Sequence, residues 1–186
     1  MKRAGGGTPV IGIAGWKKSG KTTLATRLIA EFTRRGLRVA TVKHAHHDFQ
    51  IDDAQTDSAR HRRAGASQVA VVSTRRWALI TELGGDPEPD LSEVIGRLGP
   101  CDLVIVEGYK SAPIPKIEAR RSAAFGSEPL AGKDEDIVAV AADHAADGFG
   151  RPVFALDDVV GIADFIATSI GLTEAVPAAV DAPAKA

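Results

Sequence analysis

Short apolar runs alternate with amphipathic stretches along most of the chain. The apolar runs carry few charges, a pattern typical of parallel strands covered on both faces. We predict strands over 9–14, 39–44, 69–73, 77–82, 103–107, 137–142 and 153–156. We predict helices over 22–35, 57–64, 91–98 and 158–170. This alternation predicts an α/β protein with a mostly parallel, twisted sheet flanked by helices on both faces.

The two ends of the chain differ from this pattern. Residues 1–8 are predicted to be a flexible leader, and residues 173–186, rich in Ala and Pro, to be a disordered tail. Between them we find no internal repeat and no linker long enough to separate domains. Residues 9–172 are therefore predicted to form a single domain.

The strongest motif lies between the first predicted strand and helix, where residues 15–22 match GxxxxGK[ST] and Thr23 follows. This motif predicts that the single domain over 9–172 is a P-loop nucleotide-binding domain. Gly15 and Gly20 allow the backbone to turn its N–H groups toward a phosphate, and the following helix adds its positive N-terminus. Lys21 would neutralise phosphate oxygens during catalysis, and the Thr22 hydroxyl would ligate Mg²⁺. The nucleotide-binding candidates here are Gly15, Trp16, Lys17, Lys18, Ser19, Gly20, Lys21, Thr22 and Thr23.

A second element of the same kind is the apolar strand over 103–107, which ends in Glu107. This is the pattern of a Walker B strand, with Glu in place of the more familiar Asp. A carboxylate there can hold Mg²⁺ or orient the attacking water. Glu107 is therefore predicted to be both a metal ligand and a catalytic residue, and Gly108 to allow a phosphate to approach closely.

Four of the five histidines fall between residues 44 and 61, among several carboxylates. One interpretation is a switch-like segment near the γ-phosphate, with Lys43 and His44 as charge donors. Its carboxylates would serve Mg²⁺, and the candidates are Asp48, Asp52 and Asp57. A transition-metal site and a solvated polar loop are the other two interpretations. The metal site would use His44, His46 and His47.

Composition and charge narrow the class of protein. The chain has 186 residues, a net charge of -1 and one cysteine, so an internal disulfide is excluded. Residues 1–130 carry 20 Lys and Arg against 14 Asp and Glu, and the remainder is acidic. Because no aromatic residues interleave the basic ones, we favour a small polyphosphate ligand over nucleic acid. No apolar run is long enough to span a membrane and no signal peptide is evident, so a cytoplasmic location is predicted.

Several segments together resemble the molybdopterin-guanine dinucleotide biosynthesis protein B (MobB) family, over about residues 8–172. The phosphate loop is common to many NTPases. The segment Val-Lys-His-Ala-His-His-Asp-Phe and the segment Glu-Gly-Tyr-Lys followed by Ile-Pro-Lys-Ile-Glu are more specific. The resembling segments are 15–24, 42–49, 57–66, 76–79 and 106–118.

The resemblance implies a GTP-binding adaptor with weak hydrolysis. It would serve, usually as a homodimer, as an adaptor to the guanylyltransferase that attaches GMP to molybdopterin. GTP and Mg²⁺ are the implied ligands, and contact with molybdopterin or its guanine dinucleotide is left open. The apolar run over 77–80 could serve an interface. Where the family often has Pro-Gly-Lys, this chain has Ala-Gln-Thr at 54–56.

Guanine selectivity has no familiar motif, since Asn-Lys-x-Asp and Thr-Lys-x-Asp are absent from the sequence. Asp143, after the strand over 137–142, is the candidate to bind guanine N1 and N2. Two rival functions remain: a small-molecule kinase that binds its acceptor at 43–66, and a metal-delivery GTPase that uses the histidines. A pure binding adaptor, in which the nucleotide only sets conformation, is compatible with the resemblance.

Overall fold

The computed structural model describes residues 7–45, 49, 51, 55–124 and 128–172. Their contacts group the chain into two compact units. Unit 1 comprises Met1–His44 and Leu91–Ala186, and unit 2 comprises Ala45–Asp90. Whether the two behave as one domain, as the sequence predicts, stays a prediction.

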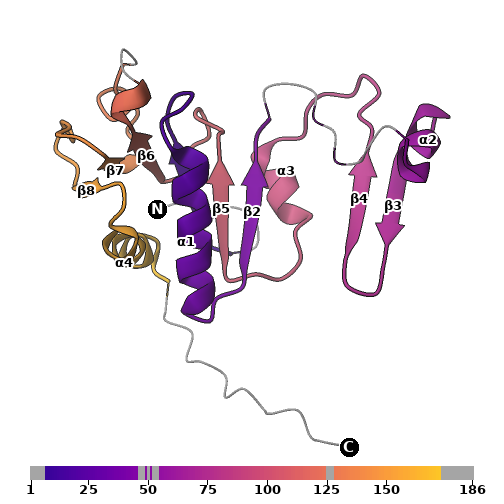
Figure 1. Cartoon of the computed structure of the whole chain (residues 1–186), viewed down its shortest axis with the longest axis horizontal. Helices are drawn as coiled ribbons and strands as arrows, with labels where there is room; N and C mark the ends of the chain where they lie inside the picture. The colour runs from indigo at the N-terminus through magenta and orange to yellow at the C-terminus, as the bar shows by residue number, and fades with distance from the viewer. Residues whose placement is uncertain (1–6, 46–48, 50, 52–54, 125–127, 173–186) are drawn as a thin grey trace, which may run out of the picture. The chain divides into compact units, whose positions relative to one another are not determined.

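Unit 1 is built on a six-stranded sheet in the order β2-β5-β1-β6-β7-β8, in which every described pairing is parallel. Figure 1 shows these strands beside helix α1. Because parallel strands share a direction, their carboxyl ends meet at one edge of the sheet. The strands are β1 (Val10–Ala14), β2 (Val39–Lys43), β5 (Leu103–Glu107), β6 (Lys116–Arg120), β7 (Ile137–Ala142) and β8 (Val153–Ala155).

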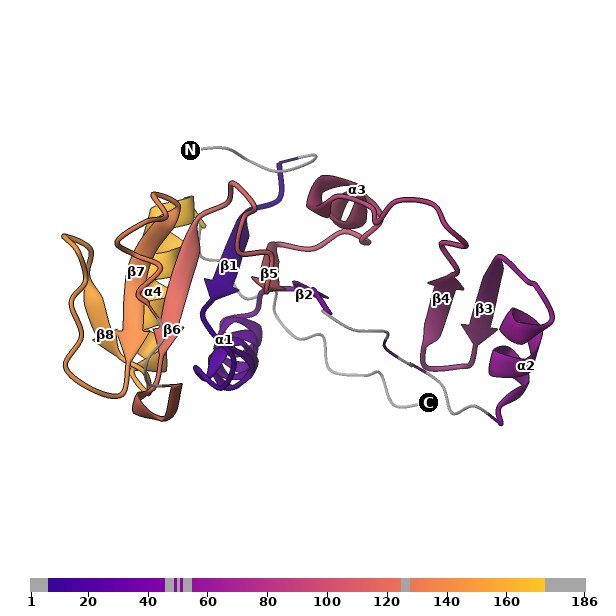
Figure 2. The same cartoon turned by 90° about the horizontal axis from the view of Figure 1, so that it is seen from above.

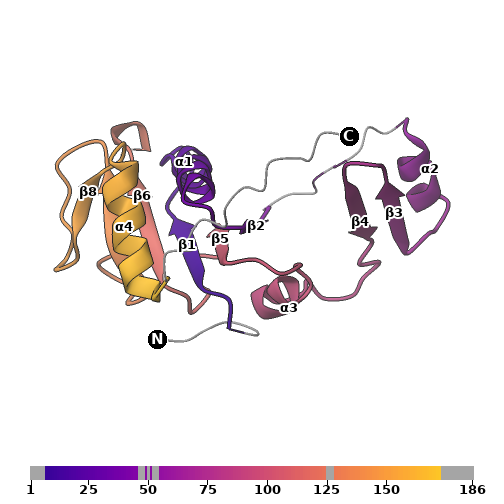
Figure 3. The ribbon, with the colours of Figure 1, turned by 90° about the horizontal axis from the view of Figure 1, so that it is seen from below.

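Helices cover both faces of this sheet, as predicted. On one face, α1 (Lys21–Arg34) and α4 (Val159–Ile170) bury a continuous apolar core that includes Phe32, Ile105 and Ile162. On the other face, α3 (Leu91–Gly96) packs Ile95 into a second cluster. Figures 2 and 3 show α1 and α3 on opposite sides of strands β1, β5 and β2.

Strand β6 was not among the predicted elements. Its residues alternate charged and apolar, a pattern unlike that of a buried parallel strand, yet Lys116 and Glu118 are each only 1% exposed. Lys116 Nζ donates to the Ala112 carbonyl at 2.7 Å and lies 3.0 Å from Asp134. Glu118 accepts the backbone N–H groups of Leu130 and Ala131. Burial of the two charges is possible because each is paired.

Unit 2 contains helix α2 (Asp57–Arg63) and an antiparallel hairpin of β3 (Gln68–Val72) and β4 (Trp77–Thr81). Thr56 caps α2 by accepting the Ala59 N–H, and Arg62 of the helix pairs with Glu82 beyond β4 at 2.8 Å. These three elements lie where the sequence predicts them, within one or two residues. A 3-10 turn over Ser122–Ala124 belongs to unit 1.

The described helices are too short and too polar to cross a lipid bilayer.

Candidate nucleotide-binding site

The phosphate-loop motif connects β1 to α1 at the carboxyl edge of the unit 1 sheet. Gly20 precedes the helix in a left-handed conformation, with φ of 93°, and supplies no side-chain cap. The first N–H groups of α1 therefore have no capping side chain, and their positive end faces the loop. This is the backbone arrangement that binds phosphate in such loops.

Glycine is required at both ends of the loop. Gly15 has φ of 142°, and a Cβ there would meet the Ser19 hydroxyl and lie 2.6 Å from the Ala119 carbonyl oxygen. A Cβ on Gly20 would lie 2.7 Å from Nε of Arg121. The close packing around both glycines fixes the course of the loop against β6 and the residue after it.

Two predicted Mg²⁺ ligands are in direct contact. The Thr22 hydroxyl, at the start of α1, donates to Glu107 Oε1 at the end of β5, at 2.7 Å. Lys43, the last residue of β2, places its Nζ 3.6 Å from the same oxygen. Adjacent parallel strands β2 and β5 thus bring a cation and a carboxylate to the helix N-terminus. The hydroxyl and the carboxylate are oxygen donors of the kind that Mg²⁺ prefers.

Lys21 folds back over the loop and donates from Nζ to the Trp16 carbonyl oxygen at 2.7 Å. Partial burial lowers the pKa of its ammonium group; Glu107 opposes that shift, and the positive charges of Lys110 and Lys43 add to it. Several positive charges therefore converge near the loop, and a polyphosphate would relieve their mutual repulsion.

Of the remaining loop residues, some are held by contacts or buried and the others are exposed to solvent. The Trp16 indole donates to the Glu128 carbonyl at 2.7 Å, and Lys110 Nζ lies 3.8 Å from the centre of its ring. Lys17 and Lys18 are exposed, as is Thr23. Ser19 is buried instead.

Residues after β2 and β5 meet near the same edge. The His44 N–H donates to the Glu107 carbonyl oxygen at 2.9 Å, and the His44 ring packs against the Tyr109 ring with centroids 4.7 Å apart. A Cβ on Gly108 would lie 2.9 Å from that of His44, so the small residue is needed for this packing. The predicted approach of a phosphate to Gly108 stays a prediction.

Other predicted metal ligands lie outside the described residues, namely Asp48, Asp52, His46 and His47. Asp57 begins α2 in unit 2. Within the part of the chain that the structure describes, no group of three or more His, Cys, Asp or Glu side chains could hold a metal ion. The roles assigned to Asp48 and Asp52, and the metal-delivery alternative, stay predictions.

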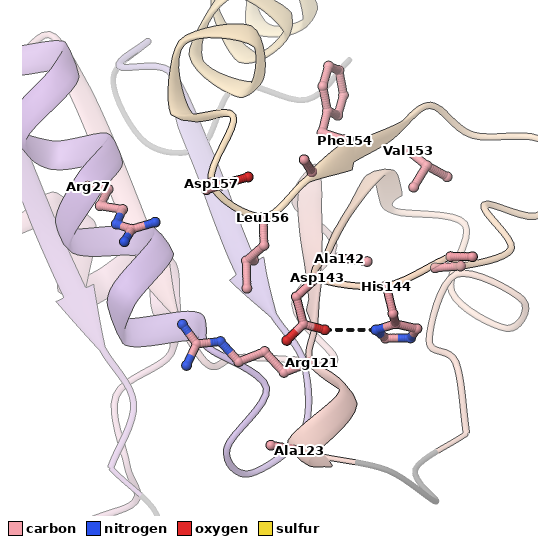
Figure 4. A pocket seen from close by; sticks show the side chains of 13 residues that line it. Arg27, Arg121, Ala123, Ala142, Asp143, His144, Val153, Phe154, Leu156 and Asp157 are labelled. Atoms are coloured by element: carbon pink, nitrogen blue, oxygen red, sulfur yellow. Dashed lines mark hydrogen bonds and ion pairs between the residues drawn. The ribbon is translucent and has the colours of Figure 1, made fainter.

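Asp143 follows β7 and lines a cavity of about 810 Å³ at the ends of β7 and β8. Figure 4 shows its carboxylate joined to the His144 ring, with Nδ1 of His144 2.9 Å from Oδ1. The same oxygen accepts the Ser122 N–H at 2.8 Å. The hydrogen bonds from His144 and Ser122 lower the pKa of the Asp143 carboxyl.

Sequence reasoning missed Arg121, which directly follows the unpredicted strand β6. It lines both the cavity at β7 and β8 and a second space of about 340 Å³ around Gly20, Lys21 and Thr22. Within the described chain, its guanidinium makes no hydrogen bond or ion pair. The sequence could have indicated Arg121 only by its position directly after a strand. Strand β6 itself was not predicted, because its sequence contains charged residues.

The parallel sheet, the loop between β1 and α1, and the carboxylate at the end of β5 define a P-loop NTPase-like α/β protein. The model of the MobB family, described as molybdopterin guanine dinucleotide synthesis protein B, matches residues 10–143. The chain belongs to this family.

Named relatives agree with that assignment. The chain is 39% identical over 161 residues to the molybdopterin-guanine dinucleotide biosynthesis adapter protein of Haemophilus influenzae, covering 85% of this chain and 87% of the relative. It is 38% identical over 160 residues to the adapter protein of the same name from Escherichia coli, covering 85% and 91%. A crystal structure of a MobB protein homolog from Bacillus stearothermophilus superposes with a TM-score of 0.64 at 29% identity, covering 88% of this chain and 99% of that one.

Proposed function

We propose that this protein binds GTP with Mg²⁺ at the loop of unit 1. We propose further that it acts as an adaptor for the guanylyltransferase that attaches GMP to molybdopterin. Membership of the MobB family supports a place in molybdopterin-guanine dinucleotide biosynthesis. The observation that carries the nucleotide proposal is the 2.7 Å contact of Thr22 with Glu107 beside the amino end of α1.

The residues of the loop have distinct roles in this proposal. Thr22 and Glu107 would hold Mg²⁺, which would neutralise the negative charge of the phosphates. Lys21 would exchange the Trp16 carbonyl for a phosphate oxygen, since its Nζ is held there by a single hydrogen bond in the described structure. Glu107 would also orient the attacking water in a slow hydrolysis.

The hairpin of unit 2 carries exposed apolar side chains that support an interface with another protein chain. On one face of the hairpin, Val72 pairs with Trp77 and Ala70 with Leu79. Val72 is 75% exposed, Trp77 70% and Leu79 50%. Clustered exposed apolar side chains mark interaction surfaces. We propose that this face joins a second copy of the chain in a homodimer.

The adaptor role can be tested by sedimentation velocity with the purified guanylyltransferase. We expect a complex in the presence of GTP and Mg²⁺, and much less complex without nucleotide or with Lys21→Ala. A complex that forms equally well in all three conditions would contradict a role for the nucleotide. No complex in any condition would contradict the adaptor proposal.

A further inference from the structure

The cavity at the ends of β7 and β8 has the composition of a site for a planar polar ring. Its walls include the apolar side chains of Ala142, Val153 and Leu156, and its volume is about 810 Å³. Two cations, Arg27 and Arg121, line it from the side of α1 and β6 (Figure 4). Ligand sites combine apolar walls with a few polar groups in this way, and in α/β sheets they lie beyond the carboxyl ends of strands.

The cavity adjoins the phosphate loop through one residue. Arg121 lines the space around Gly20, Lys21 and Thr22 as well as the cavity, and its Nε lies 2.7 Å from the place of a Cβ on Gly20. A ligand with phosphates on the loop would therefore pass Arg121 and place its other end in the cavity. Because guanidinium is always charged and recognises phosphate well, Arg121 suits contact with the phosphate nearest the sugar.

Two carboxylates that line the cavity differ in what they already bind. Asp143 accepts the Ser122 N–H and lies 2.9 Å from His144 Nδ1. Asp157, in the turn between β8 and α4, has no hydrogen bond or ion pair from its carboxylate to any residue that the structure describes. Figure 4 shows the Asp157 carboxylate without a dashed contact, unlike that of Asp143.

Guanine presents two adjacent donors, N1–H and the N2 amino group, which one carboxylate can accept together. Adenine presents an unprotonated N1 at the corresponding position and would meet the carboxylate with an acceptor. We infer that Asp157 is the residue that selects guanine, holding the base in the cavity while the phosphates lie on the loop. The inference rests on the proposed binding of GTP and names the part of the site that distinguishes one base from another.

The test replaces the two acceptor oxygens of the Asp157 carboxylate by the one acceptor and one donor of an amide. In Asp157→Asn the amide complements xanthine, which has N1–H beside a C2 carbonyl, and no longer complements guanine. Calorimetric titration with GTP and XTP should show GTP binding weakened about tenfold or more and XTP binding strengthened, so that the preference inverts. Asp157→Glu, which keeps the charge and moves the carboxylate, should weaken GTP binding without favouring XTP.

The rival candidate is Asp143, which the sequence predicts to bind guanine, and Asp143→Asn makes the same chemical change at that carboxylate of the cavity. It should keep the preference for GTP. The inference is overturned if Asp157→Asn leaves the GTP to XTP ratio of the parent unchanged, or if Asp143→Asn inverts it instead. Thermal unfolding of each variant separates loss of fold from loss of binding.

The Lys21→Ala variant separates a wrong assignment of Asp157 from a wrong proposal of GTP binding. Suppose that the parent binds GTP, the Lys21→Ala variant does not, and the Asp157→Asn variant keeps the parent's base preference. Only the assignment of Asp157 is then wrong. If the parent binds no guanine nucleotide, the proposed function is wrong and the assignment is overturned with it.

Discussion

The carboxyl edge of the unit 1 sheet and the hairpin of unit 2 distribute their polar and apolar groups in opposite ways. At the sheet edge, the apolar residues of the strands are buried and the charged groups Lys21, Lys43 and Glu107 gather around a loop. On one face of the hairpin the apolar side chains of Trp77 and Leu79 are exposed. The first surface suits a small charged ligand, and the second suits another protein.

This contrast predicts that changes in one region leave the function of the other intact. Nucleotide affinity should depend on unit 1 residues and self-association on the hairpin. Substitutions in each region test this separation.

Lys21→Ala should have the largest effect, weakening GTP binding by at least about a hundredfold, since hydrogen bonds to charged groups are worth about 1.5–3 kcal/mol each. Self-association, measured by sedimentation equilibrium, should not change. Arg97→Ala removes an exposed cation that precedes β5, at the opposite edge of the sheet, and should keep the parent's affinity. Equal GTP affinity of Lys21→Ala and the parent would show that the loop does not bind the nucleotide.

The double variant Trp77→Lys with Leu79→Lys should weaken the dimer by about thirtyfold or more, because buried aromatic anchors at interfaces contribute about 2 kcal/mol or more. GTP binding by calorimetry should stay within about twofold of the parent. Ala78→Lys, at an exposed position on the other face of the hairpin, is the control for added charge. A dimer that survives the double variant would refute the role of the hairpin.

Glu107→Gln should reduce Mg²⁺-dependent hydrolysis about tenfold or more while leaving Mg²⁺-free GTP binding nearly unchanged. The amide keeps an oxygen acceptor for the Thr22 hydroxyl but loses the negative charge that attracts the metal. Single-turnover hydrolysis and a Mg²⁺ titration would measure the two effects. Hydrolysis at the parent's rate would show that Glu107 has no part in the reaction.

The smallest effect concerns stability alone. Glu31 accepts hydrogen bonds from Arg34 and Arg35, and these lower its pKa from 4.5 to about 2. Because the folded-state pKa is depressed, its stabilisation is complete above pH 4.5 and is lost as pH falls toward about 2.

Glu31→Gln should therefore lower the free energy of unfolding by about 2 kcal/mol at pH 7, with a smaller difference at pH 3. Urea unfolding at the two pH values measures this. GTP affinity and self-association should stay as in the parent, because Glu31 lies in the last two turns of α1, away from the loop. A difference that grows as pH falls would contradict the assigned pKa.

Much of unit 1 could be predicted from sequence because local patterns and global fold agree there. The strand over Leu103–Glu107 is apolar until its last residue, and the loop after Ala14 matches a motif with a defined structural context. Strand β6 could not be predicted, because Lys116 and Glu118 are buried by partners that lie 12 to 18 residues further along the chain. Such pairing is a property of the tertiary structure.

The candidate site shows the same division. The contact of Thr22 with Glu107 follows from two motifs whose strands are neighbours in the sheet. Arg121 and Asp157 belong to no motif, and only the fold brings them to one cavity. The position of Asp143 after a strand could be predicted, but its hydrogen bonds to Ser122 and His144 depend on a turn that the sequence pattern does not specify.

Calorimetric titration of the intact protein with GTP and with ATP, each with and without Mg²⁺, tests the proposed binding of GTP most directly. We expect GTP to bind tightly in a Mg²⁺-dependent manner and ATP to bind weakly. Preference for ATP, or binding of neither nucleotide, would contradict the account.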